Sequence, residues 1–239
     1  MTFYLGTHES HWLKDLDVPL FVSKRRLDRV KTPPVAIHRW AMDSGGFTEL
    51  HKYGGWETTS AEYADSVKYY IKETGMMDWA APQDWMCEAS ALRATGLSVK
   101  EHQIRTVKNF LELRDILGYM VIPVLQGWSR DSYLECEEMY DKAGVDLNVE
   151  PVIGLGSVCR RNAGVEITQI IEALQPLNLH GFGVKGDSYL ANKDLLTSAD
   201  SMAWSFGARW KPPLDGCEHR SCQNCRRYAL LWREKMLVS

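Results

Sequence analysis

Two aspartates suggest covalent chemistry, because each lies in or directly after a short β-rich run. Asp43 leads into Ser44-Gly45-Gly46, and Asp200 lies in the segment 197–205, where alternation places it on one side with Met202. A carboxylate is costly to bury without a partner, so its position at a strand end indicates contact with a ligand or a polar network. Two separated carboxylates at one site are what glycosyl transfer requires. One attacks the anomeric carbon and the other moves protons.

Other β-rich runs also end in polar or glycine-rich residues. Asp84 follows Gln83, and Gln126 ends the apolar run that starts at Val121. The Gln126 amide offers both a donor and an acceptor, which turn chemistry does not readily explain. The alternatives are structural, since Asp-Ser-Gly-Gly is also a good turn sequence and Asp84 is equally well placed to cap a helix. Further β-rich runs end in glycine-rich residues, which are Gly127, Gly154-Leu155-Gly156 and Gly183-Val184-Lys185-Gly186.

A cysteine cluster near the C-terminus has metal-ligand spacing. Cys217, His219, Cys222 and Cys225 form the pattern C-x-H-x2-C-x2-C, which suits one soft cation, and zinc is the natural choice. Three sulfurs and one nitrogen would close the coordination shell, so we expect a structural Zn²⁺ that holds a helix starting near Arg226. The alternative is three free thiols on a loop. The predicted zinc-binding subregion spans residues 215–227.

The elements that must position these groups alternate between strand-like and helix-like segments. Capping-box spacing from Thr59 to Glu62 and from Ser98 to Glu101 predicts two helix starts. Eight β-rich runs with helical crossovers indicate an α/β fold, a compact (β/α)8 TIM-type barrel with a small C-terminal zinc-binding appendix. A doubly wound open sheet is the main alternative, and residues 1–239 are expected to form a single domain. The runs are 3–8, 18–23, 35–42, 78–82, 121–126, 149–155, 179–184 and 198–204.

Composition excludes several classes of protein. With 239 residues, 45% of them apolar and 25% charged, the chain fits neither a disordered nor a fibrous protein. The formal charge of -3 means that a nucleic-acid partner must be held by a local basic face. The run 24–31 and Arg220, Arg226 and Arg227 could provide such a face, although they are equally typical of solvated surfaces. No apolar run reaches the ~20 residues of a membrane helix, so a cytoplasmic protein is expected.

Taken in order, these motifs resemble the tRNA-guanine transglycosylase superfamily, and more closely its short DpdA-type branch, the deazapurine DNA modification enzymes of phages and bacteria. The resemblance runs from about residue 3 to residue 225. Asp43-Ser44-Gly45-Gly46-Phe47 is its most specific segment, together with the cysteine cluster. Gln126-Gly127, Gly154-Leu155 and the Asp200 segment follow in the order of the family's motifs.

The resemblance implies a zinc-containing barrel that exchanges guanine in nucleic acid for a 7-deazaguanine, such as 7-cyano-7-deazaguanine, without cutting the backbone. Asp200 would be the nucleophile at C1′ and Asp43 the general acid and base. A covalent intermediate divides the exchange into two displacements, which predicts retention at the anomeric carbon. The implied base-binding residues are Asp84, Gln126, Gly127, Gly154, Ser44 and Gly45, and further site contacts are His8, Phe47 and Lys185.

Two features separate this chain from the tRNA enzymes. It is shorter than they are, which favours DNA as the substrate, and it has no histidine beyond His219, whereas their fourth zinc ligand lies downstream of the cysteines. Exchange in tRNA is the alternative activity. A catalytically silent nucleic-acid-binding relative is the alternative from another class.

Overall fold

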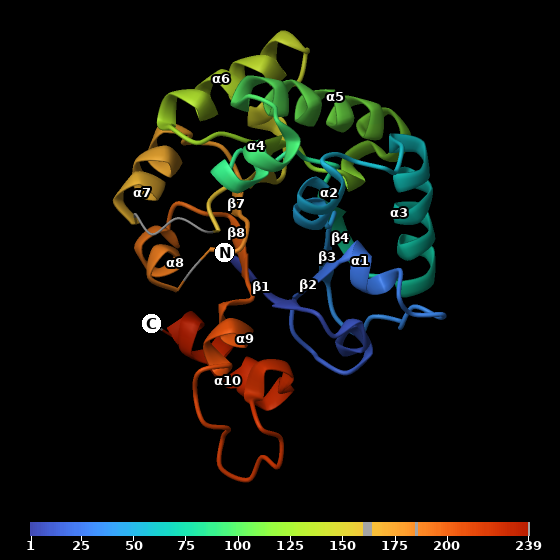
Figure 1. Ribbon diagram of the computed structural model, residues 1–239, viewed down its shortest axis with the longest axis vertical. Coiled ribbons are helices and arrows are strands. Elements are labelled where there is room, and N and C mark those ends of the chain that lie inside the picture. Colours follow the sequence, from blue (N-terminus) through green and yellow to red (C-terminus); the bar gives the residue numbers. More distant parts are fainter. Residues whose placement is uncertain (160–163, 185, 239) are drawn as a thin grey trace.

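One sheet of eight parallel strands forms the centre of the computed structural model, which describes residues 1–159, 164–184 and 186–238. The sheet curls, and helices cover its outer face (Figure 1). The strands are β1 (Thr2–Thr7), β2 (Leu20–Ser23), β3 (Trp40–Asp43), β4 (Met77–Ala80), β5 (Val124–Leu125), β6 (Ile153–Leu155), β7 (Leu179–Gly181) and β8 (Ser198–Ser201).

Helices alternate with these strands along the described ranges. The α-helices are α1 (Lys24–Leu27), α2 (Gly46–Tyr53), α3 (Ser60–Thr74), α4 (Ala89–Thr95), α5 (Val99–Leu117), α6 (Arg130–Lys142), α7 (Gly164–Ala173), α8 (Gly186–Asn192), α9 (Ala203–Ala208) and α10 (Arg226–Val238). The short 3-10 helices are η1 (Ser10–Lys14), η2 (Gly118–Met120), η3 (Leu147–Val149) and η4 (Cys222–Asn224).

The strand order, β4-β3-β2-β1-β8-β7-β6-β5, follows the chain around a ring without the reversal of a doubly wound sheet. One bridge between Ala80 and Val121 joins the two edges, and the Ile122 N–H donates to the Ala80 carbonyl at 3.3 Å. Pro123 has no N–H to donate, which explains why β5 begins only at Val124. The parallel eight-stranded α/β architecture is therefore confirmed, but the barrel is not fully closed between β4 and β5.

Local sequence signals explain the two long helices beside this seam. The Thr59 hydroxyl accepts from the Glu62 N–H at 3.2 Å, and the Ser98 hydroxyl accepts from the Glu101 N–H at 3.3 Å. Each glutamate carboxylate accepts in return from the N-cap N–H, so both predicted capping boxes are confirmed. The helices that they start, α3 and α5, pack against each other.

An apolar layer fills the inside of the curled sheet below the strand ends. It is made of inward-facing residues from successive strands, a packing distinct from the larger core between the sheet and its helices. Its buried members are Tyr4, Phe21, Ala41, Trp79 and Ile122. These side chains form an apolar floor beneath the residues at the carboxyl ends of the strands.

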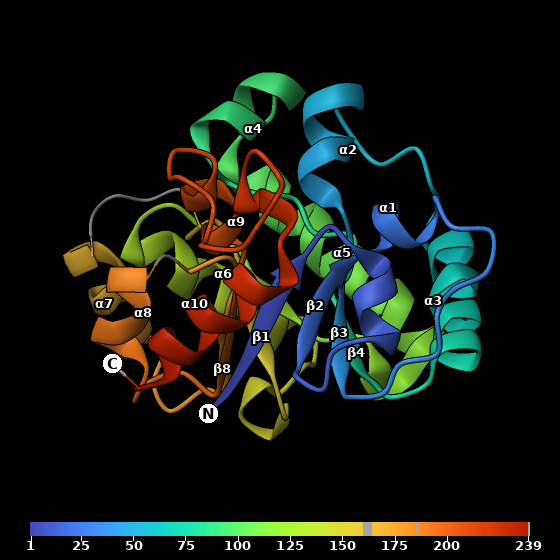
Figure 2. The same ribbon diagram turned by 90° about the horizontal axis from the view of Figure 1, so that it is seen from below.

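The C-terminal segment packs back onto the start of the chain. Figures 1 and 2 show α9 and α10 beside β1, and α10 contacts both β1 and α9. Arg233 donates to the Phe3 carbonyl at 3.3 Å, and the Phe3 and Trp232 rings lie 6.0 Å apart. Within the described ranges, none of the helices has the length and apolar character needed to span a bilayer.

Candidate active site

A cavity of about 410 Å³ lies at the carboxyl ends of the strands. Parallel strands bring these ends to one side of a sheet, which is where sites form in barrels of this kind. Residues far apart in the chain therefore meet there. The predicted site residues that line the cavity are His8, Asp43, Ser44, Gly45, Phe47, Asp84, Gln126 and Asp200.

Two other predicted residues, Gly127 and Gly154, do not join this set. A Cβ atom on Gly127 would lie 2.9 Å from the Tyr133 ring, and a Cβ atom on Gly154 would collide with Phe182. Both glycines therefore allow close packing, and among the described residues neither lines the cavity, whereas Gly156 does. Lys185 lies outside the described residues.

Asp43 is the last residue of β3 and stands beside Ser23, its partner in register at the end of β2. The Ser23 hydroxyl and the Gly45 N–H donate to its carboxylate. Burial raises the pKa of Asp43 above its usual range, and the nearby Asp200 carboxylate raises it further, against the effect of these two hydrogen bonds. The environment therefore favours a carboxyl group that retains its proton.

Asp200 lies within β8 and is held by donors from the neighbouring strand region. The Gly183 N–H donates to Oδ1 at 2.9 Å, and His180 Nε2 lies 3.3 Å from the same oxygen. His180 Nδ1 lies 2.8 Å from the Ser198 hydroxyl. An Nε2–H that donates to Asp200 leaves Nδ1 as the acceptor for Ser198, so one tautomer satisfies both contacts.

His180 is a site residue that the sequence analysis missed. It is fully buried, and aromatic rings surround it at centroid distances of 5.9 Å for Tyr4, 5.7 Å for Phe21 and 4.8 Å for both Trp79 and Phe182. These rings fix the imidazole and exclude water from it. The sequence shows a histidine in the run that forms β7. Only the pairing of β7 with β8 places this histidine beside Asp200, and the sequence alone does not give that pairing.

Asp84 and Gln126 form a buried hydrogen-bonded pair. Gln126 Nε2 donates to Asp84 Oδ2 at 2.6 Å, and the Ser44 hydroxyl donates to Oδ1 at 3.2 Å. The Ser157 hydroxyl donates to Gln126 Oε1 at 2.7 Å and accepts from the Cys87 N–H at 2.7 Å. This chain of contacts fixes the amide of Gln126 with its nitrogen toward Asp84. Burial, followed by the charge of Asp43, raises the pKa of Asp84 to about 7.

The loop after β3 requires glycine at Gly45. Its φ is +83°, and a Cβ atom there would lie 2.7 Å from the side chain of Arg25. Gly45 thus gives both the left-handed turn and the room for Arg25 to cross the loop. The turn predicted for Asp-Ser-Gly-Gly is present, and it is also part of the cavity wall.

Arginines border the cavity on the side of α1. Arg25, Arg26 and Arg29 line it together with His8. Burial lowers the pKa of His8, and the charges of Arg26, Arg209 and Arg29 lower it further. His8 is therefore favoured in its neutral form among a local group of cations, on a chain whose formal charge is -3.

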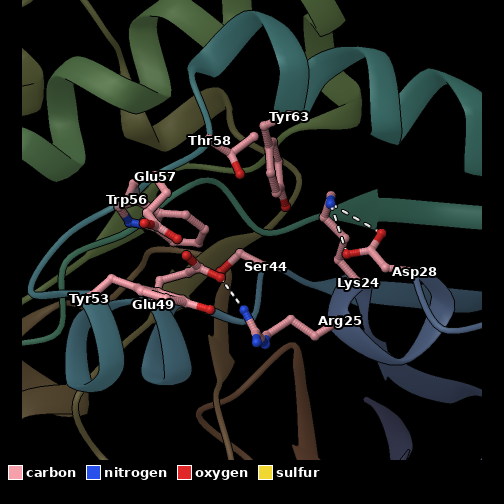
Figure 3. Close-up of a pocket in the computed structure, with 10 residues that line it drawn as sticks. All are labelled: Lys24, Arg25, Asp28, Ser44, Glu49, Tyr53, Trp56, Glu57, Thr58 and Tyr63. Atoms are coloured by element: carbon pink, nitrogen blue, oxygen red, sulfur yellow. Dashed lines mark hydrogen bonds and ion pairs between the residues drawn. The ribbon is translucent and has the colours of Figure 1, made fainter.

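A smaller pocket of about 200 Å³ adjoins the cavity and shares Arg25 and Ser44 with it (Figure 3). In Figure 3 Arg25 points at Glu49, with which it forms an ion pair, and Lys24 pairs with Asp28 at 3.0 Å. Arg25 therefore lies in the wall between the two pockets, where its charge is paired with Glu49. Arg26 and Arg29 line the larger cavity and do not line the smaller pocket.

The C-terminal cluster brings its four predicted ligands together. The ligand atoms of Cys217, His219, Cys222 and Cys225 all lie within 4.8 Å of one another. A tetrahedral ion with metal–sulfur bonds of about 2.3 Å separates two sulfurs by about 3.8 Å, so the set fits one metal ion. The Leu214 N–H donates to Cys222 Sγ at 3.3 Å, which is a typical outer-shell contact to a ligating thiolate.

This cluster is tied to the strand that carries Asp200. Ser205 donates to the Gln223 carbonyl at 2.7 Å, and Ser221 donates to the Ala208 carbonyl at 3.0 Å. These bonds join η4 and its N-cap residue Ser221 to α9, which follows β8 after Met202. Met202 lines the cavity with Asp200, as the alternation predicts. A metal bound here would stabilise the end of the active-site wall.

Comparison with known proteins gives a family and a fold. The family described as DpdA, DeoxyPurine in DNA protein A, matches residues 1–239. No curated protein matches the chain. A structure of oxaloacetate acetylhydrolase in complex with oxalate has 12% identity and a TM-score of 0.51, covering 87% of this chain and 79% of that one. A complex of oxaloacetate acetylhydrolase with 3,3-difluorooxalacetate has 12% identity and a TM-score of 0.52, covering 99% and 91%. At this identity the likeness shows the fold alone.

Proposed function

The chain belongs to the DpdA family, deoxypurine in DNA protein A, and we propose that it exchanges guanine in DNA for a 7-deazaguanine such as 7-cyano-7-deazaguanine. One observation carries the proposal. The same cavity is lined by two carboxylates in different environments, Asp43 and Asp200, and by a polar pair suited to a purine edge, Asp84 and Gln126. This is the set of groups that glycosyl transfer from a base requires.

In the first step a carboxylate oxygen of Asp200 attacks C1′ of the deoxyribose. The bond from C1′ to the base breaks, and the proton on Asp43 moves to the departing guanine. The product is an aspartyl-glycosyl ester with an unbroken DNA backbone. The donors on Asp200 Oδ1 hold the carboxylate in one orientation, which favours attack by the second oxygen.

In the second step the incoming base takes the place of guanine. Asp43, now ionised, takes the proton from its ring nitrogen, that nitrogen attacks C1′, and the ester bond to Asp200 breaks. Both carboxyl groups return to their starting states. Two displacements at one carbon give retention of configuration.

Asp84 and Gln126 would hold both bases in turn. The Asp84 carboxylate can accept from the N–H groups of a guanine, and the Gln126 amide nitrogen can donate to its O6. Ser157 supports this role because it fixes the direction of the Gln126 amide. The target base must leave the helical stack to reach the cavity.

Arg26 and Arg29 support a polymeric substrate, because their charges border the cavity where a flipped nucleotide would leave its phosphates. A hydrolase of free nucleosides would not need them.

The cysteine cluster would hold a structural Zn²⁺, with Cys217, His219, Cys222 and Cys225 closing its shell, so that it takes no part in the exchange.

The test is base exchange by the purified protein. Duplex DNA or tRNA carrying labelled guanine is incubated with 7-cyano- or 7-aminomethyl-7-deazaguanine, and label release is followed together with mass spectrometry of the digested nucleosides. Release from DNA with a deazaguanine deoxynucleoside appearing supports the proposal, and Asp200→Asn should abolish it. Asp131→Asn, on the exposed side of α6, is the matched control.

Other outcomes would assign other functions. Release from tRNA alone would make the protein a tRNA-guanine transglycosylase. Salt-sensitive binding without release from either polymer would indicate a silent binding protein. Full turnover by Asp200→Asn would remove Asp200 as the nucleophile.

A further inference from the structure

Glu88 is a buried carboxylate in the cavity wall that the steps above do not use. It lines the cavity with Met86, Ser157 and Cys159, and it is 4% exposed. The Cys159 thiol donates to Oε1 at 3.3 Å. Oε2 is buried and has no hydrogen-bond partner among the described residues. Such an oxygen is costly in a folded protein, so its presence calls for an explanation.

Local structure does not supply that explanation. Glu88 is the N-cap residue of α4, but its side chain makes no capping hydrogen bond. No lysine, arginine or histidine of the described ranges forms an ion pair with it. A molecule bound in the cavity that Glu88 lines would supply a partner that the described residues do not.

The neighbours of Glu88 indicate which part of a bound base would face it. Hydrogen bonds run along the wall from Asp84 to Gln126 and from Gln126 to Ser157, and the N–H that binds Ser157 belongs to Cys87, the residue before Glu88. The wall therefore presents Asp84, Gln126, Ser157 and Glu88 in that order.

The atoms of a guanine-like base follow the same order. Its N–H donors lie on one edge, O6 lies next to them, and position 7 follows O6 on the groove edge. A base whose N–H groups meet Asp84 and whose O6 meets Gln126 turns position 7 toward Ser157 and Glu88. A substituent on position 7 then lies against the carboxylate that lacks a partner.

We infer that Glu88 reads the substituent on position 7 and that the preferred incoming base carries an N–H donor there, such as an aminomethyl group. The inference rests on the proposed base exchange and narrows its substrate class. A carboxylate accepts hydrogen bonds and attracts a cation, whereas a nitrile offers no donor and leaves Oε2 unpaired. Because Oε2 is buried, the carboxyl group must turn for this oxygen to meet the substituent.

The test compares two incoming bases that differ only in this group. The ratio of kcat/KM for 7-aminomethyl- over 7-cyano-7-deazaguanine is measured in wild type, in Glu88→Gln and in the control Glu138→Gln. Glu88→Gln keeps the shape of the side chain and removes its charge, whereas Glu138 is exposed on α6 and pairs with Lys142. We expect a wild-type ratio of about 10 to 100, lost in Glu88→Gln and kept in Glu138→Gln.

Binding of the two free bases, measured by calorimetry, is a readout that does not depend on turnover. Wild type should bind the aminomethyl base about 10-fold or more tightly than the cyano base, and Glu88→Gln should not. A wild-type preference for the cyano base, or an unchanged ratio in Glu88→Gln, overturns the inference while the exchange reaction stands. If neither base is exchanged and no assay releases labelled guanine, the proposed function itself is overturned.

Discussion

Asp43 and Asp200 reach the cavity from β3 and β8, strands that are separated in the sheet by β2 and β1. Their environments differ in ways that suit different roles. Burial raises the pKa of Asp43, which favours its protonated form, whereas Asp200 faces the Gly183 N–H and the ring of His180. A buried carboxyl group that favours its proton suits the role of the acid, and a carboxyl group oriented by two neighbouring groups suits the role of the nucleophile.

At the same scale, His180 is expected to position Asp200 rather than to contact the substrate. His180→Phe keeps a ring within the aromatic enclosure but removes both polar contacts. We expect kcat to fall about 10- to 100-fold with KM for DNA nearly unchanged, because the loss concerns the orientation of the nucleophile. Steady-state kinetics measure this, with exposed His11→Phe as the control. A change confined to KM would contradict the positioning role.

The buried carboxyl of Asp84 predicts a dependence of stability on pH. Its pKa of about 7 in the folded protein exceeds the value of about 4 in an unfolded chain, so the folded state holds the proton more tightly. The free energy of unfolding should therefore fall as pH rises from about 4 to about 7 and then level off. Asp84→Asn removes this contribution. Thermal melts should show a smaller decrease in Tm over this range than in wild type, and equal decreases would refute the assignment.

Helix α1 and the turn after it carry the cations that we assign to DNA. Arg26 and Arg29 border the cavity, whereas Arg25 is paired with Glu49. The run 24–31 was interpreted either as a basic face for nucleic acid or as an ordinary solvated surface. Both interpretations hold in part, because some of its charges are paired within the protein and others line the cavity. The role of each charge depends on where α1 and the following turn place it, which the sequence of the run alone does not reveal.

Replacing Arg26 and Arg29 together by alanine should weaken DNA binding. We expect about a 10-fold loss of affinity near 0.15 M salt and a decrease of about 2 in the slope of log K against log salt concentration, because two phosphate contacts are lost. Fluorescence anisotropy across a salt series measures both. The exposed Arg93→Ala on α4 is the control, and an unchanged salt slope in the double variant would exclude these contacts.

Much of the arrangement of elements could be predicted from local signals. Capping boxes and β-rich runs depend on neighbouring residues, so α3, α5 and the strands were found, and polar strand ends led to Asp43, Asp84, Gln126 and Asp200. The open seam was not predicted, because it depends on how Ala80 and Val121 meet across the sheet. The sequence analysis did not identify His180, Ser157 and Glu88 as site residues for the same reason, since their partners are distant in the chain.

The C-terminal segment joins the two ends of the chain around the site. η4 is bonded to α9, α9 follows the strand of Asp200, and α10 packs on β1 (Figure 2). A metal ion on the cysteine cluster would therefore stabilise the cavity wall from outside. The chemistry of exchange would remain with the carboxylates.

Removing that metal should destabilise the protein before it affects the chemical step. We expect one zinc ion per chain by elemental analysis, and we expect Cys222→Ser or a strong chelator to remove it and to lower Tm by several degrees. The residual activity should follow the folded fraction. A metal-free protein with unchanged Tm would show that the cluster is not a structural zinc site.

The proposed exchange requires Asp200 to form a covalent bond with the deoxyribose of DNA. The most direct measurement traps the protein with guanine-containing DNA in the absence of an incoming base, denatures it, and maps the modified peptide by mass spectrometry. We expect a denaturation-resistant adduct on Asp200 that disappears when a 7-deazaguanine is added before denaturation. An adduct on another residue, or complete exchange with no adduct at any time, would rule out Asp200 as the nucleophile.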